Sequence, residues 1–141
     1  MLSDRLVRVI ENHAEELTRS VLDDLAGNEL TPGYHKLHRT ELHDRVYDVY
    51  HNLGKWITGK TEGPIKHTYM TLGRTRHAEG IPLSEVVKAL ILTKRHLWDY
   101  VRSAGLVDTT VELYQEEELN LMVGRFFDHA IYFTTRGFEE S

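Results

Sequence analysis

Apolar residues recur at steps of three and four along almost the whole chain, and this spacing constrains the fold more than any other feature. Such steps place apolar side chains on one face of an α-helix, which has 3.6 residues per turn. The pattern stops only at short segments rich in glycine, asparagine and proline, which interrupt helices. No stretch shows the strict alternation expected of a half-buried strand. The sequence therefore predicts an all-α fold.

The interruptions divide the chain into about five long helices. The expected breaks between them are, in chain order, Gly27-Asn28, Gly59-Lys60, Gly80-Ile81-Pro82 and Ser103-Ala104-Gly105. The last helix should open at Thr109, because Glu112 three residues later gives the spacing of a capping box. It then continues to the chain end. A length of 141 residues suits one domain, so residues 1–141 are expected to form a single helical domain.

Composition narrows the classes of partner and chemistry. Cysteine is absent, which excludes disulfides, cysteine-bound zinc, iron–sulfur clusters and thiol catalysis, and fits a reducing cytosol. The net charge of -5 argues against nucleic acid, since phosphate contacts require basic residues. No apolar run approaches the roughly 20 residues that span a bilayer. We therefore expect a cytoplasmic protein with neither a membrane nor a nucleic-acid partner.

The segment from Arg74 to Leu90 allows two interpretations. A basic helix end, a glycine, a proline and a new helix could form a helix-turn-helix that binds DNA. However, the helix after this corner carries neighbouring apolar pairs, including Val86-Val87 and Leu97-Trp98. Such a wide apolar stripe indicates a helix buried on most of its circumference. We favour a core helix, and a DNA-binding regulator is the lesser alternative.

Two segments resemble a known family. The segment LGRTRHAEGIPLSEVVKALILTKRHLWDYV (Leu72–Val101) is similar to the central signature of the N-terminal sensor domain of stressosome co-antagonists of the RsbR/RsbD type, the RsbT co-antagonists. The segment FFDHAIYFTTRGFEE (Phe126–Glu140) resembles the closing helix of that domain. The same domain is also found at the N-terminus of some histidine kinases. The resemblance implies a globin-like helical bundle that usually lacks haem and often forms homodimers.

The resemblance further implies a sensory input that precedes a signalling output, such as a STAS domain, a kinase or a transcription-regulator module. Catalysis is not expected, because the sequence contains no nucleophile elbow, phosphate-binding loop or metalloprotease motif. We therefore predict a non-catalytic regulatory domain that acts through helix rearrangement in a dimer. The first and last predicted helices carry the longest apolar stripes and are the best candidates for the dimer surface.

The nine histidines raise the alternative of a haem-binding or small-ligand-binding sensor of the globin type. His77, three residues before the glycine of the corner, is the first candidate for a haem ligand, because a histidine near a helix end holds haem iron in globins. His67, ten residues earlier on a similar face, is the second. A metal site is not expected, since isolated histidine spacings often occur without a metal; the set considered is His35, His38 and Glu41.

Four aromatic residues are candidates for lining a ligand cavity between helices. Tyr47, Tyr50 and His51 follow His43 at four, seven and eight residues and share one helix face, while Trp98 lies on the predicted core helix. Aromatic bodies with polar tips suit an apolar pocket that also orients its ligand. The same residues could form the rim of the core with their polar tips in water, which we favour. The sequence itself identifies no ligand or signal.

Overall fold

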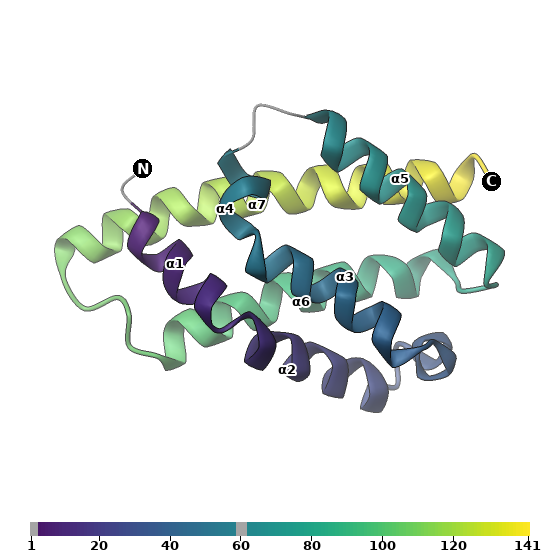
Figure 1. The fold of residues 1–141 in the computed structure, drawn as a ribbon, viewed down its shortest axis with the longest axis horizontal. Helices are drawn as coiled ribbons and strands as arrows, with labels where there is room; N and C mark the ends of the chain where they lie inside the picture. The colour runs from purple at the N-terminus through teal and green to yellow at the C-terminus, as the bar shows by residue number, and fades with distance from the viewer. Residues whose placement is uncertain (1–2, 59–61) are drawn as a thin grey trace.

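The computed structural model describes residues 3–58 and 62–141, which form seven α-helices and no strand. The helices are α1 (Asp4–Asn12), α2 (Ala14–Gly27), α3 (Arg39–His51), α4 (Leu53–Thr58), α5 (Glu62–Ala78), α6 (Leu83–Ser103) and α7 (Thr110–Glu139). A short 3-10 helix, η1 (Pro32–Lys36), precedes α3. Figure 1 shows their arrangement. The all-α prediction is confirmed, with seven helices in place of about five.

The first predicted helix is broken into α1 and α2 at His13. The backbone of His13 leaves the helical region, with φ -112° and ψ 21°. Its N–H donates to the carbonyl of Ile10, and its own carbonyl accepts from Leu17. Helical hydrogen bonding thus resumes after a single residue. The apolar spacing continues across so short a break, which is why the sequence predicted one helix.

The second predicted helix is divided into three pieces. Pro32 opens η1, and Leu37 after it is extended, with ψ 152°. Asn52 then separates α3 from α4, with φ -109° and ψ 26°. The predicted fading of this helix at Gly59-Lys60 lies outside the described residues. The proline is therefore at the start of a 3-10 turn, and the α-helix begins only at Arg39.

The corner between α5 and α6 is where the sequence predicted it. Gly80 takes the left-handed conformation, with φ 75°, which glycine adopts without strain. After the corner α6 buries residues along its whole length: Glu85, Val86, Ala89, Leu90, Leu92, Thr93, Leu97, Trp98 and Val101. It packs against α7, α2 and α5. The interpretation of this segment as a core helix is confirmed.

The longest helix, α7, has 30 residues and extends roughly 45 Å. It starts as predicted, because the Thr109 hydroxyl accepts the Glu112 N–H at 3.2 Å. Figure 1 shows α7 running along the molecule and ending on the side away from α1. This helix contacts α5, α6, α4 and α1, so it connects most of the fold.

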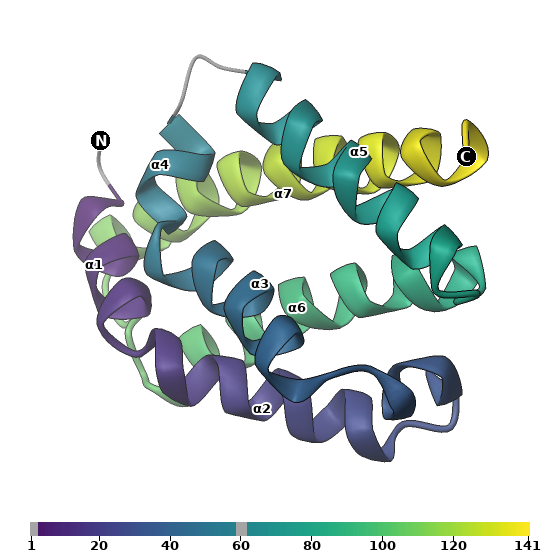
Figure 2. The same cartoon turned by 45° about the vertical axis from the view of Figure 1, so that its right-hand side comes forward.

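Helices α5 and α7 form the most extensive interface between any two helices. Figure 2 shows α5 crossing the C-terminal half of α7. Two glycines allow this close approach, Gly73 on α5 and Gly137 on α7. A Cβ atom at Gly73 would lie 2.6 Å from the Phe138 nitrogen, and one at Gly137 would lie 2.8 Å from the Met70 Cα. The two backbones are therefore in direct contact, with no side chain between them.

In the part of the chain that the structure describes, no helix combines the length and apolar character needed to cross a bilayer.

Candidate functional site

A cavity with a volume of about 310 Å³ lies among α2, η1, α3, α5 and α6. Half of its sixteen lining residues are aliphatic: Leu25, Leu42, Val46, Val49, Leu72, Val86, Ala89 and Leu90. The remaining residues are Tyr34, Asp44, Arg45, Asp48, Thr68, Tyr69, Arg76 and Thr93. Four of the five surrounding elements contribute aliphatic side chains and η1 contributes the ring of Tyr34, so the interior of the cavity is largely apolar.

Arg76 is the most unusual residue of the lining, because its charged side chain is only 1% exposed. Its Nη2 donates to Glu41 at 2.9 Å, and its Nη1 donates to Glu79 at 2.8 Å. The guanidinium carbon also lies 5.3 Å from the centre of the Tyr34 ring, in cation–π geometry. A buried cation requires such partners, because burial without them is costly.

These partners keep the guanidinium of Arg76 charged. Burial on its own lowers the pKa of Arg76, but the interactions with Tyr34, Glu79 and Glu41 outweigh it and raise the pKa above its ordinary value. Glu41 shows the converse. Burial raises the pKa of its carboxyl, yet hydrogen bonds from Arg45 and Arg76 outweigh burial and lower that pKa. The wall of the cavity therefore contains a charged guanidinium, paired with carboxylates behind it.

One nitrogen of Arg76 remains without a partner. Among the described residues, nothing accepts a hydrogen bond from its Nε, although this atom is buried. Most buried polar atoms in proteins are hydrogen-bonded, so an exception next to a cavity requires an explanation. The apolar cavity thus has one unsatisfied donor on a residue that lines it.

Two tyrosines add hydroxyl groups to the lining. Tyr34 is carried by η1, which is fixed to α6 because the Gly33 N–H donates to Glu85 at 2.7 Å. Tyr69 comes from α5, and its ring packs against Trp56 and Phe126, with centroid distances of 6.0 and 5.8 Å. Burial raises the pKa of both tyrosines, so both hydroxyls remain neutral. They can therefore donate as well as accept hydrogen bonds.

The polar side of the cavity lies between α3 and α5. Asp44 is exposed, while Arg45, Asp48 and Thr68 are half-buried. Figure 2 shows the two helices from which these residues come. An opening at this place would be lined by charged groups, whereas the deep wall formed by α6 is apolar.

The four aromatic residues considered as candidates for a cavity, and expected rather at the rim of the core, do not belong to this lining. Tyr50 is fully buried, and its hydroxyl donates to the Thr93 carbonyl at 2.6 Å. Tyr47 and His51 stack on each other with centroids 5.0 Å apart, and His51 is exposed. Trp98 is buried in the core. The structure therefore brings Tyr47 and His51 together but does not gather the four around one space.

The two candidate haem ligands are both exposed residues of α5. His67 does not line the cavity, and His77 packs edge-on against Phe138 of α7, with ring centroids 5.0 Å apart. His77 is thus a neighbour of the α5–α7 crossing. Over residues 3–58 and 62–141, no group of three or more histidine and acidic side chains is placed to hold a metal ion.

Arg76 was not among the site residues predicted from the sequence, although its position in the sequence contains a signal. Ile65, Tyr69 and Leu72 follow one another at four and three residues and form one buried face of α5. Arg76 continues the same four-three-four spacing, whereas His77 is exposed. A basic residue in register with an apolar face is a candidate for a buried, paired charge. The spacing could therefore have identified Arg76 as a wall residue.

The fold and the site together define the class of protein. It is an all-α domain with a largely apolar cavity, and the wall of this cavity contains a charged arginine. The family model of the RsbT co-antagonist protein rsbRD N-terminal domain matches residues 2–141. The chain therefore belongs to this family of non-catalytic sensory domains, which implies a stressosome-type regulatory input domain. Comparisons with curated proteins and with solved structures gave no match.

Proposed function

We propose that this chain is a regulatory input domain that works as a homodimer through α7 and passes its signal to an output domain or to a kinase or STAS partner. The family membership supports the regulatory role. The globin-like arrangement expected from the family resemblance and the cytoplasmic location expected from the composition are both part of the proposal. The observation that carries the dimer is a stripe of exposed apolar side chains on α7.

The α7 stripe consists of Val111, Tyr114, Leu121 and Tyr132, which are between 56% and 69% exposed. At 3.6 residues per turn, these four positions fall within about 80° of each other around the helix. The buried residues of α7 lie on the opposite side of the helix: Leu119, Val123, Phe126, Phe127, Ala130, Phe133, Thr134 and Gly137. These four side chains therefore face away from the fold, and the charged residues Glu118 and Arg125 lie between them in the same arc.

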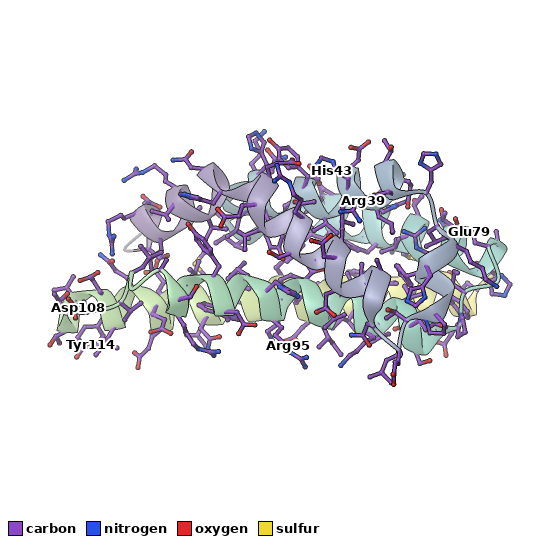
Figure 3. All side chains as sticks on the ribbon, turned by 90° about the horizontal axis from the view of Figure 1, so that it is seen from below. Arg39, His43, Glu79, Arg95, Asp108 and Tyr114 are labelled. Atoms are coloured by element: carbon purple, nitrogen blue, oxygen red, sulfur yellow. The ribbon has the colours of Figure 1, made fainter. Side chains whose placement is uncertain are left out.

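A stripe of this kind favours association with an identical helix. Large exposed apolar side chains in line along a helix are uncommon on monomers and mark interaction surfaces. A twofold axis across α7 would let each stripe cover its own counterpart. Figure 3 shows Tyr114 beside Asp108 at one end of the molecule and Glu79 at the other. The α7 stripe thus begins far from the α5–α6 corner.

The dimer is tested by sedimentation equilibrium of the wild type, Leu121→Glu and Leu113→Glu. Leu113 is the matched control, because it is 54% exposed on the same helix but lies outside the α7 stripe. We expect a dimeric wild type, a dimeric Leu113→Glu and a largely monomeric Leu121→Glu, all with the same helical content. A wild type that stays monomeric at high concentration would refute the proposal, as would equal effects of the two substitutions.

A further inference from the structure

We propose that the cavity among α3, α5 and α6 binds an uncharged, largely apolar small molecule that carries one hydrogen-bond acceptor. The molecule would be the signal of the proposed input domain, and only this regulatory consequence rests on the proposed function. Binding itself rests on the size of the cavity, on the composition of its wall and on the tyrosine hydroxyls in its lining.

The size and the wall both suit a small ligand. Pockets that bind small molecules have volumes of roughly 300–1,000 Å³ and are mainly apolar, with a few polar groups that orient the ligand. The volume of about 310 Å³ is at the small end of this range. Such a space accommodates one ring or a short aliphatic chain. The aliphatic side chains of α3 and α6 would surround its apolar part.

The acceptor is inferred from the two tyrosines that line the cavity, Tyr34 and Tyr69. Burial keeps their hydroxyls neutral, so each hydroxyl can donate a hydrogen bond. The Nε of Arg76 is completely covered, so a ligand does not reach it. A ligand whose carbonyl, ether or hydroxyl oxygen accepts from a tyrosine hydroxyl gains affinity over one of the same shape that lacks the acceptor.

The charges near the cavity argue against an ionised ligand. Two cations, Arg45 and Arg76, face four carboxylates: Asp44, Asp48, Glu41 and Glu79. Arg76 is thus already neutralised, and an added anion would meet an excess of negative charge. An added cation would have to leave these partly exposed carboxylates and enter an apolar space, where an unpaired charge is costly. A neutral ligand avoids both penalties.

Three probes of similar shape separate these possibilities: acetophenone, ethylbenzene and benzoate. Each is titrated into the isotope-labelled full chain, and affinity and location are read from amide shifts in heteronuclear NMR spectra. We expect saturable shifts at cavity residues, including Ala89 and Thr93. Acetophenone should bind about 3- to 10-fold more tightly than ethylbenzene, which lacks the acceptor, and benzoate should bind most weakly.

Substitution of Ala89 tests the location. Ala89 lines the cavity from α6 and is nearly buried, so Ala89→Phe fills the space. Ala78→Phe is the matched control, because Ala78 is an exposed residue at the end of α5. The first variant should lose acetophenone binding at least tenfold, and the control should retain it. Ala89→Leu serves the same purpose with less added volume where the phenylalanine variant fails to fold.

Several outcomes would overturn the inference. They are the absence of saturable shifts with any probe, equal affinity for acetophenone and ethylbenzene, tighter binding of benzoate, and undiminished binding in a folded Ala89 variant. Repeating the titration on Leu121→Glu separates this inference from the dimer. Binding by a monomeric variant, or by a wild type that never dimerises, would support the cavity site even where the proposed function fails.

Discussion

Replacing Gly137 by alanine should destabilise the fold because it forces the backbones of α5 and α7 apart. The new Cβ would lie 2.8 Å from the Met70 Cα and closer still to the Met70 carbonyl oxygen. Carbon atoms pack best at roughly 3.5–4.0 Å, so the helices must separate by about 1 Å. The obstructing atoms belong to the backbone, and no rotamer change can remove them.

The magnitude follows from two opposing effects. Alanine is a better helix former than glycine by about 1 kcal/mol, which favours the variant. Overpacking a well-packed contact costs about 1–3 kcal/mol and occasionally more. The contact is backbone against backbone in the most extensive helix interface of the fold, so we expect an overpacking cost of about 3 kcal/mol or more. We expect a net loss of about 2 kcal/mol or more, which lowers Tm by roughly 4–8 °C.

The assay is urea and thermal unfolding followed by circular dichroism, with Gly124→Ala as the control. Gly124 lies inside the same helix, but a Cβ there would meet nothing within 4 Å. The identical substitution should therefore stabilise the protein there by up to about 1 kcal/mol. Opposite signs at the two positions are expected. A Gly137→Ala protein as stable as Gly124→Ala would refute the close crossing.

The partner glycine supplies a second comparison. Gly73→Ala should also destabilise, because its Cβ would lie 2.6 Å from the Phe138 nitrogen. One separation of the helices relieves both clashes, so the double variant should lose less stability than the sum of the single losses. Strict additivity would mean that the two glycines act at independent contacts.

Three further predictions concern single interactions. Arg76→Lys should cost about 1–3 kcal/mol in urea unfolding, because an ammonium cannot reproduce the planar donors of the guanidinium, whereas Arg74→Lys at an exposed position should be neutral. Thr109→Ala removes the N-cap of α7 and should cost about 1 kcal/mol in the same assay, with Thr109→Ser close to the wild type. The pKa of His43 is raised by its hydrogen bonds to Glu15 and Asp44. These interactions therefore stabilise the folded protein fully below pH 6.5, and this stabilisation is lost as pH rises through the raised pKa. His43→Gln should flatten the fall of the urea midpoint above pH 6.5, and an unchanged fall would contradict this assignment.

The sequence predicted those features that depend on local chemistry. The corner at Gly80 and the N-cap at Thr109 are signalled by the residues that form them. The burial of α6 is signalled by neighbouring apolar pairs. The break at His13 was missed because a single non-helical residue hardly changes the apolar spacing.

The cavity and the helix crossing depend on residues that are distant in the sequence. Arg76 and Glu41 are 35 residues apart, and nothing local to either indicates that they pair. In the sequence, Gly73 and Gly137 are simply residues with low helix propensity. Their role, which is to let two helix backbones come into contact, is visible only in the folded structure. Tyr50 was expected at the rim of the core or in a cavity. Its hydroxyl instead donates to the Thr93 carbonyl of α6, and its ring is part of the core. Tertiary contacts decide such positions.

Helix α5 connects the cavity to the proposed dimer surface. One of its faces carries the wall residues Tyr69, Leu72 and Arg76, and an adjacent face carries Met70 and Gly73 at the crossing with α7. Contacts between side chains can absorb a small displacement by rotamer changes, whereas a contact between backbones cannot. A shift of α5 caused by filling the cavity would therefore be passed to α7 and to the stripe on its far side. The same rigidity predicts that Gly137→Ala, even when folded, weakens the effect of a cavity ligand on dimerisation.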